Sequence, residues 1–199
     1  MNKKILFSIL LILTPFFWWN IIHPSNIPSE LIKLPQYLSN QKNNFFSEER
    51  ITIVEDARWY SINQDIGRVF FNKLYIIPTE LFYGLQAISP HNFFSSAGTY
   101  HSTPDGIPAI PFLLLPFSVL GLYQLIKNKK YLPLAIFVLT SLIPFLTGQP
   151  TLYYLIPTYL LYLYFSYYQL KLLSNRQLLN FLLLDLVYNL YIIGRIITL

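Results

Sequence analysis

His101 and Asp105 are the first residues in this sequence whose types suggest chemistry. They lie in a loop rich in glycine and proline, directly before a long apolar run. A histidine can act as an acid or a base near neutral pH, and its protonated form can bind phosphate. Loops held by a rigid scaffold often carry function. The alternative is that His101 only caps or hydrogen-bonds the local backbone, so the pair is a candidate site and no more.

Arg68 and Lys73 form a second candidate site. Two cations beside an amphipathic helix attract anionic lipid headgroups, so this pair could hold a lipid phosphate at a membrane surface. The alternative, which the sequence favours equally, is that both side chains belong to the solvated face of a helix.

Asp185 and Asn189 are one helical turn apart within an apolar run near the C-terminus. An acidic residue inside a membrane span is costly and is treated by default as functional. The alternative favoured here is a hydrogen bond from this polar pair to a tyrosine of a neighbouring span.

Other kinds of site are not indicated. The three histidines are far apart in sequence, so no metal site is predicted, and no cofactor motif is present. The net charge of +5 could suggest nucleic acid, but the excess basic residues cluster beside apolar runs. That position is typical of membrane orientation signals, and no nucleic-acid partner is expected.

The elements that must position these residues are mostly apolar. Only 12% of the chain is charged, and five long apolar runs separate short polar segments. The sequence therefore predicts an all-α polytopic membrane protein with about five transmembrane helices. The predicted spans are residues 5–22, 108–126, 131–147, 151–170 and 178–199.

Three parts follow from this pattern: an N-terminal transmembrane anchor at 1–22, an extracytoplasmic loop domain at 23–107 and a four-helix transmembrane domain at 108–199. A cleaved signal peptide is the competing interpretation of the first part. The aromatic end of the run, with Trp18 and Trp19, is more typical of a membrane interface than of a cleavage site.

The loop domain is expected to be mostly helical. Its prolines predict a short tether at the start, and residues 51–63 fit either a strand or a helix. Residues 66–88 have helical periodicity, with a polar seam at Asp65, Asn72, Thr79 and Gln86. We expect an amphipathic helix in the membrane interface, kinked or divided at Pro78. A helix packed on the membrane domain fits the same pattern.

The basic residues predict the orientation. With five alternating spans, one side of the membrane receives all the clustered bases: Lys3, Lys4, Lys127, Lys129, Lys130, Lys171 and Arg176. The positive-inside rule makes this side cytoplasmic. The N-terminus is then cytoplasmic, and residues 23–107 and the C-terminus are extracytoplasmic, in a plasma membrane.

Tyrosines run along the whole of residues 151–170. Interfacial belts explain only those at the ends. The middle ones predict a helix in contact with protein, with its hydroxyls hydrogen-bonded, which suggests assembly with another polytopic subunit.

Four short motifs resemble the C-terminal part of GT-C fold glycosyltransferases, the superfamily of dolichyl-phosphate-mannose protein mannosyltransferases and bacterial aminoarabinose transferases. They are GRVFFNK at 67–73, ISPHNFF at 88–94, HSTPDG at 101–106 and the PF and GLY landmarks within 116–123. The resemblance covers roughly residues 50–130. It implies a polyprenyl-phosphate sugar as ligand, membrane lipids as surroundings and a role in the bacterial cell envelope.

The resemblance also locates a catalytic acid, which in this superfamily lies on the first extracytoplasmic loop of a longer set of spans. We expect the half that carries this acid to be absent from the chain. Glu55 and Asp56, in the sequence EDARWY, resemble the motif of that acid, although they lie far from the first span. Two adjacent carboxylates on a solvated loop are more often plain surface.

Three hypotheses follow. The first is a non-catalytic or split-enzyme subunit in envelope glycan synthesis. The second is a small, complete membrane glycosyltransferase that uses Glu55 or Asp56. The third is a membrane scaffold without sugar chemistry.

Overall fold

The computed structural model describes residues 5–45, 47–61, 63–95, 107–148 and 151–198. Every regular element in these ranges is a helix, which confirms the predicted all-α class. The helices are α1 (Leu6–Ile12), α2 (Pro15–Ile22), α3 (Asn26–Asn44), α4 (Glu48–Trp59), α5 (Gln64–Phe70), η1 (Lys73–Tyr75), α6 (Ile76–Ala87), α7 (His91–Phe94), η2 (Phe112–Leu114), α8 (Leu115–Lys127), α9 (Tyr131–Leu139), α10 (Leu142–Thr147), α11 (Ile156–Leu170) and α12 (Asn175–Thr198).

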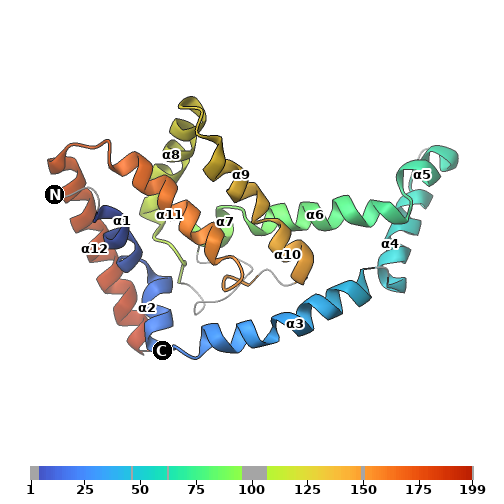
Figure 1. The fold of residues 1–199 in the computed structure, drawn as a ribbon, viewed down its shortest axis with the longest axis horizontal. Helices are drawn as coiled ribbons and strands as arrows, with labels where there is room; N and C mark the ends of the chain where they lie inside the picture. The colour runs from blue at the N-terminus through green and yellow to red at the C-terminus, as the bar shows by residue number, and fades with distance from the viewer. Residues whose placement is uncertain (1–4, 46, 62, 96–106, 149–150, 199) are drawn as a thin grey trace.

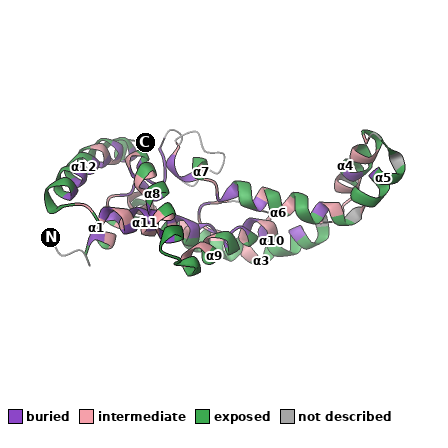
Figure 2. Ribbon diagram, turned by 90° about the horizontal axis from the view of Figure 1, so that it is seen from above, coloured by how far each residue is buried: buried purple, intermediate pink, exposed green. Residues whose placement is uncertain are grey.

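The helices form a bundle with a long arm (Figure 1). In the bundle, α11 lies against α8 and α1, while α12 packs beside α2. The arm consists of α3 and α6, which extend sideways from the bundle and carry α4 and α5 at their far end (Figure 1). Figure 2 shows exposed residues over much of α12 and over the distal α4 and α5.

The contact between α8 and α11 is unusually close because small residues line it. A Cβ atom added at Gly121 would lie 1.9 Å from the carbonyl oxygen of Phe165. The hydroxyl of Ser166 donates to the carbonyl of Leu114 at 3.3 Å, and Ser118 donates to the carbonyl of Tyr162 at 3.4 Å. Small residues at a helix contact let two backbones approach, as is common in membrane bundles.

The arm is attached to the bundle through Gln41 of α3. Its side-chain amide donates to Glu80 of α6 and to the carbonyl of Phe145 in α10, each at 3.2 Å. Arg50 of α4 forms an ion pair with Glu80 at 3.1 Å. Gly148 follows α10 with a left-handed φ of 62°, and the space beside it is filled by Gln41. Four helices therefore meet at one polar cluster.

The prediction of five continuous spans is not supported. Within the part of the chain that the structure describes, α12 is the one helix long and apolar enough to cross a membrane. The predicted first span is divided into α1 and α2, because Pro15 begins α2 and Thr14 before it is extended, with φ −110° and ψ 140°. The predicted spans at 108–126, 131–147 and 151–170 also consist of helices shorter than a bilayer crossing requires, whereas the predicted span at 178–199 corresponds to α12.

The predicted third span is divided between α9 and α10. Pro144 has no N–H group, and its ring would clash with the carbonyl of Thr140 in a continuous helix. The chain turns at Thr140 and Ser141 instead, and Thr140 accepts a hydrogen bond from the hydroxyl of Thr158 at 2.7 Å. The local break is thus compensated by a contact with α11.

The amphipathic helix expected at residues 66–88 does not form, and the break predicted at Pro78 lies elsewhere. The chain breaks at Phe71 and Asn72, between α5 and η1, and Pro78 lies in the first turn of α6, where its missing N–H group costs nothing. Asn72 makes the break, because its amide donates to the carbonyl of Val69 at 2.9 Å and accepts from the N–H of Leu74 at 2.8 Å. Local hydrogen bonds of this kind compete with a helix. The predicted polar seam therefore does not follow one helical face.

One further prediction is wrong, and one choice between strand and helix is decided. The short tether expected near residue 23 is instead α3, a helix of 19 residues with Pro35 inside it. Most of residues 51–63, where strand and helix were both open, belongs to α4.

Candidate functional site

A pocket of about 290 Å³ opens between α4 and α5 at the far end of the arm. Its lining residues are Glu55, Arg58, Trp59 and Arg68. It contains two of the residues singled out from the sequence, which came from different motifs and lie on different helices. This pocket is the candidate functional site.

Local sequence chemistry sets the geometry of the pocket. The side chain of Asn63 begins α5 by accepting hydrogen bonds from the backbone N–H groups of Asp65, at 2.9 Å, and Ile66, at 3.3 Å. A Cβ atom at Gly67 would lie 2.2 Å from the hydroxyl of Ser61, so glycine allows α5 to fold back on the end of α4. The Ser61 hydroxyl in turn donates to the carbonyl of Arg58 at 2.7 Å.

Two guanidinium groups and one carboxylate meet in this pocket. Arg58 is held in place because its Nε donates to the carbonyl of Phe71. Arg68 lies 3.8 Å from Asp65 in an ion pair between two highly exposed side chains, which leaves it able to contact a ligand. Guanidinium groups match the geometry of phosphate, so the two arginines suit a phosphorylated ligand, and the carboxylate of Glu55 lines the same pocket.

The other residues proposed for this region are placed differently. Asp56 is exposed and does not line the pocket. The backbone of Lys73 belongs to η1, but its side chain lies outside what the structure describes. His101 and Asp105 lie outside the described residues, so their candidate roles stay predictions.

Arg58 and Trp59 are the pocket residues that the sequence did not single out. Both belong to the sequence EDARWY, whose two acids are the residues that the resemblance indicates. The indole of Trp59 is 77% exposed and the ring of Tyr60 is 90% exposed. Two large exposed aromatic side chains beside two arginines are the signal that could have identified this end of α4.

Asp185 and Asn189 lie far from this pocket, since α12 and the α4–α5 pair are at opposite ends of the molecule (Figure 1). Asp185 is fully buried, and neither carboxylate oxygen has a hydrogen-bond partner among the described residues. The side chain of Asn189 donates to the backbone carbonyl of Asp185 at 2.8 Å. The expected hydrogen bond from this pair to a tyrosine of residues 151–170 is therefore wrong within the described chain.

The tyrosines of α11 find their partners inside the molecule. The hydroxyl of Tyr162 donates to the carbonyl of Ile88 at 2.6 Å, and Tyr159 is hydrogen-bonded to the hydroxyl of Thr14. Just before α11, Tyr154 donates to the carbonyl of Glu30 at 2.7 Å. The prediction that these side chains contact protein is confirmed. Because the contacts are made by this chain, they no longer point to a second subunit.

Among the described residues, no group of three or more metal-ligating His, Asp or Glu side chains comes together. Comparison with protein-family models, curated proteins and solved structures returns no match for this chain.

Proposed function

We propose that this chain is an integral membrane protein and that α12 spans the bilayer. One observation carries the proposal: α12 exposes a broad apolar side, which a helix of a water-soluble protein would keep buried. Its buried stripe combines Asp185 and Asn189 with apolar residues, and its exposed side is dominated by large apolar residues as well. These are Leu179, Leu183, Leu184, Leu186, Val187, Leu190, Tyr191 and Ile197. An apolar face that would be unfavourable in water suits lipid.

We further propose that the remaining apolar runs also lie in the bilayer, as part of a multi-pass protein with cytoplasmic basic loops. The positions of two cations support this orientation. Lys130 follows α8 and Lys171 follows α11, yet both lie over the ring of Tyr168, at 5.2 Å and 3.9 Å from its centroid. The bases of two separate loops are thus on one side of the bundle.

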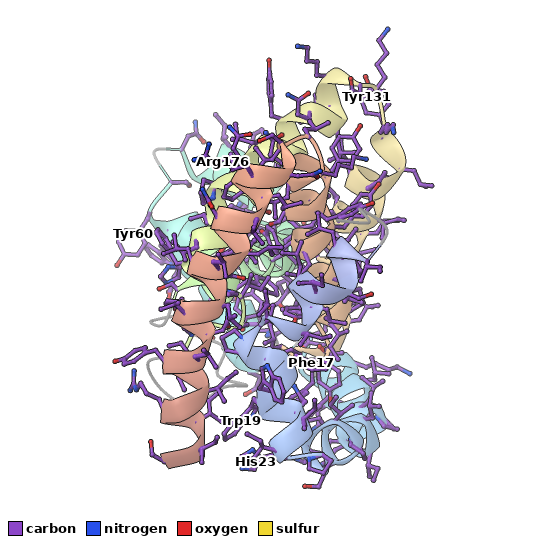
Figure 3. All side chains as sticks on the ribbon, turned by 90° about the vertical axis from the view of Figure 1, so that its left-hand side faces the viewer. Phe17, Trp19, His23, Tyr60, Tyr131 and Arg176 are labelled. Carbon is purple, nitrogen blue, oxygen red and sulfur yellow. The ribbon has the colours of Figure 1, made fainter. Side chains whose placement is uncertain are left out.

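The residue types at the two ends of the bundle also support this orientation. Figure 3 shows Arg176 at the end where Tyr131 lies, and Trp19 and His23 at the other end. Basic residues at one end and tryptophan at the other suit a cytoplasmic and an extracytoplasmic interface, respectively.

For its activity, we propose a subunit related to the C-terminal part of GT-C glycosyltransferases, acting in envelope glycan synthesis on a polyprenyl-phosphate sugar. The pocket supports this proposal, because Gly67 and Arg68 of the GRVFFNK motif both shape it. In this proposal Arg58 and Arg68 hold the lipid-linked phosphate, and another polytopic polypeptide supplies the catalytic acid.

The second candidate is a complete small glycosyltransferase. Between the two acids of the EDARWY sequence, the pocket favours Glu55, because Glu55 lines it beside two phosphate-binding arginines and Asp56 does not. The third candidate, a scaffold without sugar chemistry, leaves the grouping of these charges without a role.

Membrane insertion can be tested with single-cysteine variants, because the chain contains no cysteine. Ser29→Cys in α3 and Ser174→Cys directly before α12 are both exposed positions. Figure 1 shows the start of α3 and the start of α12 at opposite ends of the bundle. A membrane-impermeant maleimide should label Ser29→Cys in intact cells and Ser174→Cys only after lysis. Labelling of both or neither in intact cells, or release of the protein by alkaline carbonate, would contradict the proposal.

The activity requires a separate experiment. The affinity of the purified protein for a polyprenyl phosphate should fall about tenfold in Arg68→Gln, because one charged hydrogen bond is lost. The affinity should stay unchanged in Arg176→Gln. Transfer of sugar by the chain alone, lost in Glu55→Gln, would favour the complete enzyme. Binding that does not respond to Arg68→Gln would leave the scaffold.

A further inference from the structure

A second cavity, of about 380 Å³, lies along α12 near its C-terminal end. The α12 side contributes Tyr188, Tyr191, Ile192 and Arg195, at helical spacings that place them on one face. The opposite side is formed by Phe94 and Ser95 at the end of α7 and by Pro108 and Phe112 before α8. None of these residues belongs to the pocket between α4 and α5.

The groove combines an apolar floor with a polar end. Phe94 and Ile192 are buried at its base, whereas Tyr191 and Phe112 are exposed at its rim, at 65% and 60%. Among the described residues that line the groove, Arg195 is the one with a charged side chain, and it forms no ion pair with any other described residue. It lies in the last turn of α12, at the end of the helix opposite Arg176.

The groove also continues the exposed apolar surface of α12. Leu184 lies one turn before Tyr188 on the same face and is exposed. A molecule inside the bilayer can therefore enter the groove from the side. An apolar chain would lie along the floor, while an anionic head would meet Arg195 at the level where the helix ends.

We propose that this groove binds one molecule of an anionic bilayer phospholipid, with its phosphate on the guanidinium of Arg195 and an acyl chain along Phe94, Ile192 and Phe112. Basic sites at helix ends select anionic headgroups in this way. The proposal rests on the membrane location proposed above, but not on any glycosyltransferase activity.

Native mass spectrometry of the detergent-purified full chain tests it. The protein is titrated with phosphatidylglycerol and, separately, with phosphatidylcholine. The wild-type protein should retain one phosphatidylglycerol with about fivefold preference over phosphatidylcholine, the contribution of one arginine near a membrane surface. Arg195→Gln should abolish this preference, and Arg176→Gln, the matched variant at the other end of α12, should preserve it.

A second variant tests the acyl-chain side of the groove. Tyr191→Ala should reduce the fraction of protein that retains either lipid, and leave the preference for phosphatidylglycerol over phosphatidylcholine unchanged. Three results would each overturn the proposal. They are equal preference for phosphatidylglycerol in wild type and Arg195→Gln, equal loss of that preference in both arginine variants, and unchanged lipid retention in Tyr191→Ala. Failure of membrane insertion is detected independently by carbonate extraction, so the two proposals can fail separately.

Discussion

The hydroxyl of Tyr162 donates a hydrogen bond to the backbone carbonyl of Ile88 at 2.6 Å, from the middle of α11 to the end of α6. The ring of Tyr162 also contacts Phe93 and Phe94 of α7, with centroids 5.0 Å and 5.3 Å apart. One side chain thus joins the central helix of the bundle to the turn that leaves the arm.

Tyr162→Phe should lower the free energy of unfolding by about 1–2 kcal/mol, because it leaves a buried carbonyl without its donor. Thermal unfolding in detergent measures the change. Tyr123→Phe on the exposed face of α8 is the control and should have little effect. Equal stability of the two variants would mean that the hydrogen bond contributes nothing net.

Gly121→Ala should destabilise the bundle by about 1–3 kcal/mol, because its Cβ has no room beside the Phe165 carbonyl and α8 must move away from α11. The matched variant is Gly194→Ala, where a Cβ meets nothing within 4 Å. That change should be neutral or slightly stabilising, since alanine favours a helix more than glycine does. Melting temperatures of both variants, measured under identical conditions, test the prediction. A stable Gly121→Ala protein would contradict the close approach.

Asp185→Asn should keep or raise the melting temperature above neutral pH, because an unpaired buried carboxylate is costly and asparagine has nearly the same shape. Two variants that add a charge serve as controls. Asn189→Asp in the buried stripe should be strongly destabilising, whereas Asn180→Asp on the exposed side near the start of α12 should be mild. A large loss of stability in Asp185→Asn would instead reveal a partner for the carboxylate.

Arg50 and Glu80 should be coupled by about 1 kcal/mol or more in a double-mutant cycle, because both side chains are largely buried, with 25% and 15% of their surfaces exposed. The pair Glu30 and Lys33 provides the comparison, at 2.7 Å within α3 and with the lysine 48% exposed. Its coupling should be about 0.5 kcal/mol or less, as for ordinary surface pairs. Equal coupling in the two cycles would argue that the Gln41 cluster does not attach the arm.

Part of the candidate site was predictable. Arg68 was named from its residue type and surroundings, and Glu55 from the resemblance of EDARWY to a family motif. Their meeting in one pocket depends on Gly67, which lets α5 fold back on the end of α4, and no periodicity reveals that contact. Arg58 was missed because its role depends on a contact with Phe71, beyond the end of its own helix.

The sequence by itself determined the helical class, the apolar runs and the polar pair of α12, because hydrophobicity and helix propensity act over a few neighbouring residues. It did not determine where those runs divide. Pro15, Asn72 and Pro144 each permit a break, but Thr14, Arg58 and Thr158 provide the tertiary contacts at those breaks. Only the tertiary structure decided that α11 lies at the centre, because its tyrosines needed partners from segments far away in the chain.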